Sequence, residues 1–221
     1  MAKKIKKSLS AAVSAEIKSK FDLNKFKNAK GLDKNVKFKE QQWIPLSPAF
    51  TEVSGVPGIP MGHISLLRGH SDTGKTTALL EAAVSAQKMG ILPVFIITEM
   101  KWNWEHASQM GLQVNLIKDE DGEVVDYDGN FIYVDRETVH TIEDVAAFIM
   151  DLQNEQKNGN LPYDLAFFWD SIGSIPCAMS VEKLKNNNEW NAGAMSTQFG
   201  NTVNQSIVMS RKESAPYTNT L

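Results

Sequence analysis

The sequence predicts an α/β fold in which a mostly parallel sheet is flanked by helices, and three observations support it. Apolar runs of strand length occur near residues 64, 94, 131 and 165. Two of them, 93–98 and 165–170, are almost continuously apolar, like strands that a parallel sheet buries on both faces. Segments with helical patterns at 76–89 and 142–156 separate the runs, and such alternation is typical of a parallel sheet.

The first apolar run, 64–68, leads directly into Gly69-His-Ser-Asp-Thr-Gly-Lys-Thr76, which fits the pattern G-x-x-x-x-G-K-[ST] at every fixed position. The glycines allow a tight turn, so that successive backbone N–H groups converge on phosphate oxygens. Lys75 supplies a positive charge, and the Thr76 hydroxyl is suited to Mg²⁺. Helix formers follow up to Met89, and Gly90 can cap the helix. Strand, loop and helix N-terminus together predict a nucleotide phosphate site.

Two carboxylates follow apolar runs and are therefore expected at the carboxyl edge of the sheet, where ligands bind in α/β proteins. Glu99 ends the run 93–98 and is placed to polarise a water near a terminal phosphate. The alternative is that Glu99 is an acid at a helix N-terminus, stabilised by the helix dipole. Asp170 ends the run 165–170 and is followed by Ser171, as in strands that deliver one carboxylate to a metal.

Several further segments have simpler interpretations. Trp102 and Trp104 can stack on a base, but closely spaced aromatic residues more often pack internally. Residues 124–134 are typical of a hairpin that turns at Asp128-Gly129, and the acids before it lack the spacing of a calcium loop. Helix 142–156 places Val145, Phe148, Ile149 and Leu152 on its inner face.

Composition limits the class of protein. The 221 residues are 42% hydrophobic, but no apolar run approaches the roughly 20 residues that cross a bilayer, and the N-terminus lacks the apolar core of a secretory signal. The single cysteine, Cys177, forms no internal disulfide, fits a reducing compartment and is expected to be a small buried side chain.

The charge is unevenly distributed and suggests two regions. Residues 1–40 hold 12 lysines against 4 acids, a balance of +8, whereas the remainder has a balance of −11. Leu9, Val13, Ile17 and Phe21 form one helical stripe within this arm. Such an arm can bind nucleic acid or the acidic face of a neighbouring copy, or it can be a solvated tail. We therefore predict a basic N-terminal helix and linker at 1–40 and a core at 41–221.

The order of these motifs resembles the RecA family of recombinases, most closely its phage type, over roughly residues 8–221. The resemblance depends on the segments 69–77, 95–99 and 167–175, and on the leader Gly58-Ile-Pro-Met-Gly62-His-Ile. It implies a RecA-like P-loop NTPase core that binds ATP and Mg²⁺. It also implies that the N-terminal segment hooks onto a neighbouring protomer, and that a further strand and a second DNA loop would follow Leu221, leaving the core C-terminally incomplete.

The resemblance assigns individual roles. Lys75 and Glu99 are the catalytic residues it implies, with Glu99 activating water, and Thr76 and Asp170 would serve the metal. In the segment 186–193, which resembles a DNA-contacting loop, Trp190 would stack on a base, with Lys183 and Lys185 at phosphates; the alternative is a plain connection with a packed tryptophan. The implied nucleotide-binding residues are Gly69, His70, Ser71, Asp72, Thr73, Gly74, Lys75, Thr76, Thr77, Asn103 (at an adenine-contacting position) and His106 (near the stacking position).

We therefore expect an ATP-dependent recombinase that binds single-stranded DNA, forms a helical filament of identical copies and acts in recombination and repair. Recombination mediator proteins are further expected partners, and the expected location is the cytoplasm of a bacterium or a phage-infected cell. Two alternatives stay open: a hexameric DNA helicase motor of the same core fold, and a nucleotide-binding regulatory fragment without hydrolysis.

Overall fold

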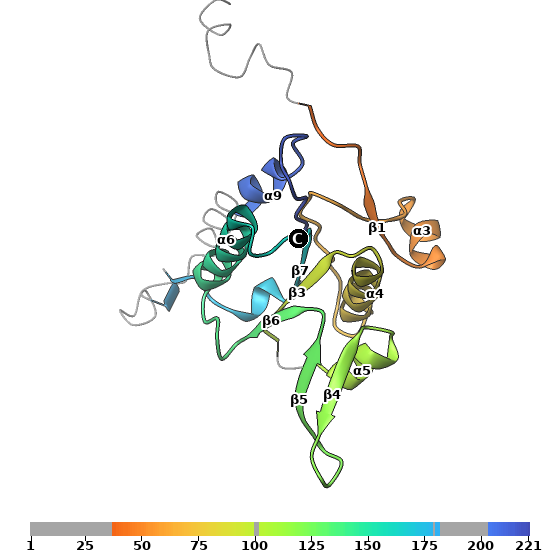
Figure 1. Cartoon of the computed structure of the whole chain (residues 1–221). Helices are drawn as coiled ribbons and strands as arrows, with labels where there is room; N and C mark the ends of the chain where they lie inside the picture. Colours follow the sequence, from red (N-terminus) through yellow and green to blue (C-terminus); the bar gives the residue numbers. More distant parts are fainter. Residues whose placement is uncertain (1–36, 100–101, 179, 182–202) are drawn as a thin grey trace, which may run out of the picture. The chain divides into compact units, whose positions relative to one another are not determined.

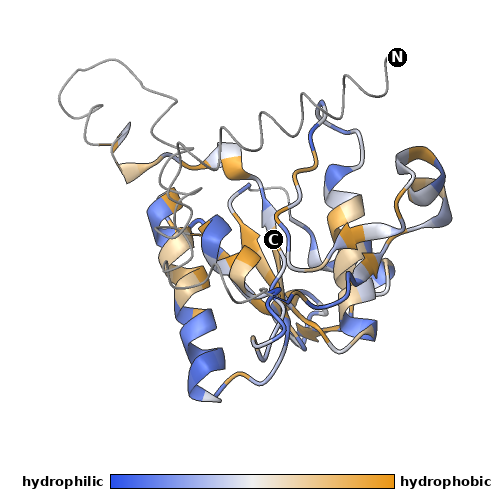
Figure 2. Ribbon diagram, turned by 90° about the horizontal axis from the view of Figure 1, so that it is seen from above, coloured by the Kyte–Doolittle hydropathy of each residue, from blue (hydrophilic) through white to orange (hydrophobic). Residues whose placement is uncertain are grey.

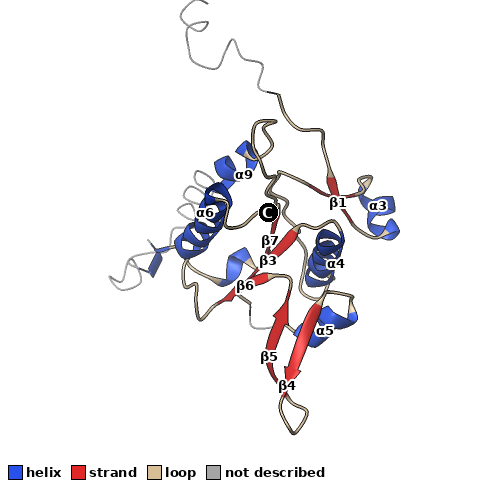
Figure 3. Ribbon diagram, in the orientation of Figure 1, coloured by secondary structure: helices blue, strands red, loops and turns tan. Residues whose placement is uncertain are grey.

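The computed structural model describes residues 37–99, 102–178, 180–181 and 203–221. Its central sheet has three parallel strands, with β3 (Leu92–Ile97) between β6 (Ile132–Asp135) and β7 (Leu165–Asp170) (Figures 1 and 3). Ile97 is in register with Asp135 on one side and Asp170 on the other, so the carboxyl ends of all three strands lie level. The predicted α/β class and the strands near 94, 131 and 165 are confirmed.

Each face of the sheet is covered by a helix, because alternate residues of a strand point to opposite sides. Phe95, Ile97 and Phe168 belong to one apolar cluster, which α4 (Lys75–Lys88) covers with Leu80, Ala83 and Val84. Val94, Ile96 and Phe167 belong to the other cluster, which α6 (Ile142–Asn158) covers with Val145 and Ile149. Figure 2 shows apolar residues concentrated along the strands and the inner faces of these helices. Both helices were predicted within two residues of their observed bounds.

The second face is completed by α9 (Gln205–Met209), whose Ile207 is fully buried in the α6 cluster. The helix α6 starts with a capping box, in which the Thr141 side chain accepts from the Asp144 N–H and the Asp144 carboxylate accepts from the Thr141 N–H. Partial burial raises the pKa of the Asp144 carboxyl. Hydrogen bonds from the His140 and Thr141 backbones and the Thr141 side chain outweigh this effect, so the net pKa is lowered. Cys177 is buried in the same cluster, as expected.

The leader before the central sheet contains a short sheet and a helix. β1 (Trp43–Pro45) pairs antiparallel with β2 (Gly58–Pro60), and α3 (Pro48–Ser54) lies between them. The Ser47 hydroxyl caps α3 by accepting from the Phe50 N–H, and Gly55 ends the helix with a left-handed backbone. The completely buried Ile44 packs this small sheet against the α4 side of the core.

The hairpin predicted at 124–134 is wrong. The observed hairpin joins β4 (Val114–Lys118) to β5 (Val124–Gly129), and its turn spans 119–123, where Asp119 Oδ1 accepts from the Asp121 and Glu123 N–H groups. The chain then passes from β5 into β6 of the central sheet instead of turning back at Gly129. The Asp119 carboxylate bonds across this turn to residues two and four positions later, whereas Asp128 Oδ1 accepts only from the adjacent Gly129 N–H and closes no turn.

The strand predicted at 64–68 is absent from the assigned strands of the described chain, and Leu66 is 75% exposed. Two backbone hydrogen bonds nevertheless attach this segment to the last residue, from Ser65 N–H to Leu221 O (2.7 Å) and from Leu221 N–H to His63 O (3.0 Å). Thr220 in turn pairs in parallel with β7 at Ala166. Thr220 and Leu221 therefore lie between β7 and the segment 63–65.

Contacts divide the chain between Phe38 and Lys39, and the unit Lys39–Leu221 contains every element named above. The predicted N-terminal helix at 8–23 and the predicted DNA-contacting segment 186–193, with Lys183, Lys185 and Trp190, lie outside the described residues. Among the residues described, no helix combines the length and the apolar character that crossing a bilayer requires.

Candidate nucleotide site

The Gly69–Thr76 loop joins the segment 63–68 to the first turn of α4, as the motif predicts. Gly74 is the residue before α4 and has φ = 85°, and Asp72 has φ = 59°, so the loop contains two left-handed positions. A side chain at Gly69 would place its Cβ 2.8 Å from the Thr73 hydroxyl oxygen, which is too close for any residue but glycine without a shift. The loop is solvent-exposed from Gly69 to Gly74.

Two side chains of the loop converge on one of its own carbonyl oxygens. The His70 carbonyl accepts from the Thr73 hydroxyl (2.8 Å) and from the Lys75 ammonium group (2.5 Å). The lysine thus lies folded over the loop, close to the backbone that the motif predicts to cradle phosphate. A phosphate bound there would compete with the His70 carbonyl for the ammonium hydrogens.

The loop is connected to the sheet by Thr76 and Asp170. The Thr76 hydroxyl donates to Asp170 Oδ2 at 2.6 Å, and the two residues are 94 positions apart. Asp170 is the last residue of β7, and Thr76 lies in the first turn of α4. The structure therefore brings together the hydroxyl and the carboxylate that the sequence assigned to the metal.

Glu99 lies beside the same strand end. Its backbone N–H donates to the Asp170 carbonyl at 3.0 Å, and its residue is exposed. The next helix, α5 (Trp104–Gln109), is capped by Asn103 and has Glu105 in its first turn, so Glu99 is not one of its N-terminal acids. Glu99 thus lies next to Asp170 along the backbone and outside the first turn of α5.

The residues assigned to the base have local structural roles. The Asn103 side-chain oxygen accepts from the His106 N–H at 2.8 Å, which caps α5, and the His106 residue is exposed. Trp102 and Trp104 pack on Phe95, with ring centroids 5.0 and 5.6 Å away, and Trp104 stacks on Phe131 at 4.7 Å. The packing interpretation of the two tryptophans is confirmed.

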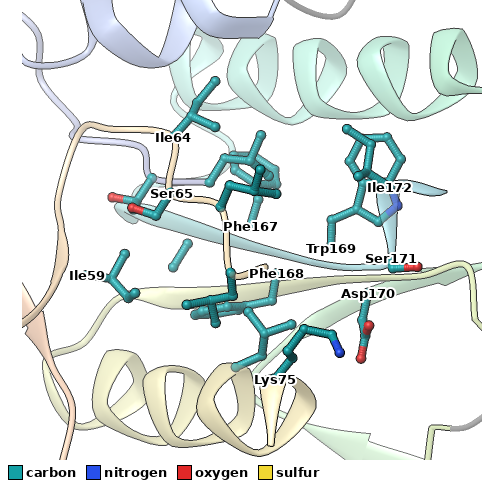
Figure 4. Close-up of a pocket in the computed structure, with 16 residues that line it drawn as sticks. Ile59, Ile64, Ser65, Lys75, Phe167, Phe168, Trp169, Asp170, Ser171 and Ile172 are labelled. Carbon is teal, nitrogen blue, oxygen red and sulfur yellow. The ribbon is translucent and has the colours of Figure 1, made fainter. Parts of the chain in front are cut away.

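A pocket of about 150 Å³ lies between β7 and the segment 64–67, next to the loop. Its walls are mostly apolar, with Ile64, Leu79 and Phe168 among them, and Lys75 and Asp170 border one end. Figure 4 shows the Lys75 ammonium group directed toward the Asp170 carboxylate on one side of β7, while Trp169 and Ile172 lie on the other. The charged end of the pocket is therefore continuous with the loop.

These residues fit a magnesium ion bound together with a nucleotide. Within the described ranges, no group of three or more His, Cys, Asp or Glu side chains can hold a metal ion. Mg²⁺ commonly uses one or two protein oxygens and completes its shell with phosphates and water. The hydroxyl of Thr76 and the carboxylate of Asp170, 2.6 Å apart, are such hard oxygen donors.

Sequence reasoning missed a second set of polar contacts at this sheet edge. Behind Asp170, the hydroxyl of Thr98 connects to Trp169, Ser171 and Ser174. Thr98 is completely buried, and a threonine at the end of an otherwise apolar strand was the one available signal.

The parallel sheet of three strands, the flanking helices and the loop at the start of α4 define a mixed α/β protein compatible with a RecA-like core. The chain is similar to curated RecA proteins. The Protein RecA of Aquifex pyrophilus is 35% identical over 83 residues, and that of Aquifex aeolicus (strain VF5) is 37% identical over 82 residues. Each match covers 37% of this chain and 24% of the relative.

The Protein RecA of Kineococcus radiotolerans is 32% identical over 75 residues, or 34% of this chain and 22% of the relative. The chain thus spans about a quarter of the length of the curated relatives it matches. No protein-family model matches the chain. Together these similarities support a relation to the RecA family.

Proposed function

We propose that this chain forms the ATP-binding core of a recombinase that binds single-stranded DNA and acts in homologous recombination and DNA repair. The observation that carries the proposal is the 2.6 Å hydrogen bond from Thr76 to Asp170. It joins a loop of nucleotide-binding pattern to the carboxyl edge of a parallel sheet, where ligands of such sheets bind. The similarity to RecA proteins supports the same conclusion.

In this proposal, the backbone of Gly69–Thr76 cradles the triphosphate of ATP. The Lys75 ammonium group leaves the His70 carbonyl, on which it rests at 2.5 Å, and neutralises the terminal phosphates. Thr76 and Asp170 hold Mg²⁺, which supplies charge neutralisation when bound. The remaining loop residues, His70, Ser71, Asp72, Thr73 and Thr77, line the phosphates, while Asn103 and His106 border the base.

The Glu99 carboxylate accepts a proton from the water that attacks the terminal phosphate. Its backbone position next to Asp170 supports this role, because a base must lie within hydrogen-bond reach of the water it activates. Glu99 also lies beyond the carboxyl end of its strand, where ligands generally bind in open α/β sheets.

The proposal extends to DNA and assembly. The Lys183, Lys185 and Trp190 side chains contact single-stranded DNA through phosphates and base stacking. Identical copies assemble into a helical filament in the cytoplasm, with the basic residues 1–40 between protomers and mediator proteins as further partners. Strand pairing then proceeds on DNA held by the filament.

The test is a comparison of ATP binding and ATP hydrolysis by the full chain, with and without a single-stranded oligonucleotide, together with electron microscopy of the same mixtures. We expect saturable ATP binding, hydrolysis that rises at least several-fold with DNA, and helical assemblies. Closed six-membered rings would identify a helicase motor instead, and binding without hydrolysis under any condition would identify a regulatory nucleotide binder. Absence of ATP binding would overturn the proposal.

A further inference from the structure

We infer that Thr98 is a positioning residue for hydrolysis: its buried hydroxyl joins the strand end that carries Glu99 to the strand end that carries Asp170. This inference rests on the proposed function, in which Glu99 activates water, and it adds a group that never contacts the nucleotide. Thr98 lies one residue beyond β3 and directly precedes Glu99. It is 0% exposed, so its hydroxyl needs partners within the protein.

The hydroxyl of Thr98 uses its full hydrogen-bonding capacity. It donates to the Ser171 carbonyl at 2.8 Å and accepts from the Trp169 indole N–H at 2.9 Å. The Ser174 hydroxyl lies 2.6 Å from it and equally 2.6 Å from the Ser171 carbonyl. A hydroxyl has one hydrogen and two lone pairs, so these three contacts use all of them when the Ser174 hydroxyl donates to Thr98.

The backbone of the same residue pair is bonded to the same place. The N–H groups of Thr98 and Glu99 both donate to the Asp170 carbonyl, at 2.9 and 3.0 Å. Side chain and backbone together therefore attach the segment 98–99 to two successive carbonyls, those of Asp170 and Ser171. The backbone bonds to Asp170 and the side-chain bond to Ser171 thus both fix the orientation of the chain at Glu99 relative to Asp170.

Asp170 and Thr98 lie on opposite faces of the sheet. Asp170 faces the α4 side, where its carboxylate contacts Thr76, while Trp169 packs with the cluster on the α6 side. Ile96 is in register with Trp169, so Thr98 follows on the α6 side by strand alternation and bonds to Trp169 there. The Thr98 hydroxyl therefore connects the ends of β3 and β7 on the α6 side of the sheet, opposite the side of the proposed nucleotide contacts.

The residues that bind the nucleotide in this proposal are distinct from the contacts of the Thr98 side chain. Phosphate and metal contacts come from Lys75, Thr76 and Asp170, none of which bonds to the Thr98 side chain. Loss of the hydroxyl therefore leaves the nucleotide contacts in place and loosens the direction of Glu99. A small displacement of a catalytic base is sufficient to slow a reaction strongly.

The experiment compares Thr98→Val, which keeps the shape of the side chain, with Thr98→Ser, which keeps the hydroxyl, in the full chain. Nucleotide Kd, kcat and KM are measured for both. We expect Thr98→Val to lower kcat about tenfold or more while Kd changes by less than about threefold, and Thr98→Ser to stay within about threefold of wild type in both. Ser210→Ala is the matched control, since it removes a buried hydroxyl in the loop after α9, bonded to the Asn219 N–H at 2.9 Å.

Wild-type kcat in Thr98→Val would overturn the inference. An equal loss of binding, turnover and thermal stability in Thr98→Val and Ser210→Ala would do the same, because it would indicate a purely structural role. If Thr98→Val does not fold, Ser174→Ala and Trp169→Phe replace it; each removes one partner, and unchanged kcat in both contradicts the inference. If the wild-type chain neither binds nor hydrolyses ATP, the proposed function itself is contradicted. A difference between variants of an active chain tests only the role of Thr98.

Discussion

The hydroxyl of Thr76 donates a 2.6 Å hydrogen bond to Oδ2 of Asp170, and so connects the start of α4 to the end of β7. We predict that Thr76→Val, which removes the hydroxyl at constant shape, weakens Mg²⁺-dependent ATP binding at least tenfold, about 1.4 kcal/mol or more. Thr76→Ser keeps the donor and should bind within about threefold of wild type. Titration of a fluorescent ATP analogue with and without Mg²⁺ measures the effect; a loss of equal size in both conditions would exclude a metal role for Thr76.

Lys75→Ala should abolish ATP binding and leave the fold intact. Within the described residues, the ammonium group donates to the exposed His70 carbonyl and to no other hydrogen-bond acceptor, so its loss removes little packing. We expect Kd for ATP to rise at least about a hundredfold, with a thermal midpoint within about 2 °C of wild type. Lys88→Ala, at the exposed far end of the same helix, is the control and should change neither value. Unchanged ATP affinity in Lys75→Ala would contradict the assignment of the loop.

Glu99→Gln should bind ATP normally and hydrolyse it at a rate at least about a hundredfold lower, because the amide cannot accept the proton of the attacking water. Equilibrium binding and steady-state hydrolysis separate the two effects. Glu105→Gln alters an exposed acid in the first turn of α5 and should hydrolyse ATP like the wild type. Normal hydrolysis by Glu99→Gln would assign the base to another residue.

The capping box of α6 should make stability depend on pH. The pKa of Asp144 is lowered in the folded chain from its ordinary value of 3.8, so the charged carboxylate stabilises the fold above that pH. This contribution is lost as the pH falls through the folded pKa. Asp144→Asn should therefore be less stable than wild type by about 0.5–1 kcal/mol at pH 7, a difference that shrinks below about pH 4. Urea unfolding across that range measures it, and a difference independent of pH would contradict the role of the charge.

A side chain at Gly58 should destabilise the fold. Its backbone lies against β1, and a Cβ would meet the Ile44 carbonyl oxygen and lie 2.8 Å from the Pro45 Cα. Since these are backbone atoms, the two strands would have to separate, and we expect Gly58→Ala to lose about 1–3 kcal/mol of unfolding free energy. Gly173→Ala, where no atom lies within 4 Å of the added Cβ, is the control and should lose far less. Equal stability of the two variants would contradict this account.

The parts of the fold that were predicted correctly are those in which a single segment determines its own structure. The strands β3 and β7 are apolar along most of their length and lie between helices, and α6 has both an apolar stripe and a Thr141 cap. The hairpin was placed wrongly because two turn signals compete at 119–123 and 128–129. The Asp119 side chain decides the matter through contacts that are specific to the folded turn. The Ser47-Pro48 start of α3 was present in the sequence as a cap signal.

The site was predictable where a motif requires particular residue types and unpredictable where contacts depend on register. Thr76 and Asp170 were both assigned to the metal from their motifs, and the structure brings them into contact. The role of Thr98 depends on the alignment of β3 with β7, which places it behind Asp170 next to Trp169. No sequence pattern specifies this alignment. The segment 64–68 was predicted to be a strand from its apolar composition, but its pairing depends on Leu221, more than 150 residues further along.

Thr220 and Leu221 therefore attach the segment that leads into the Gly69–Thr76 loop to the central sheet. The Gly62 N–H donates to the Thr220 hydroxyl and Leu221 bonds to His63 and Ser65, while Thr220 holds β7 through Leu165 and Phe167. A displacement of Leu221 therefore acts both on the approach to Gly69 and, through Thr220, on β7.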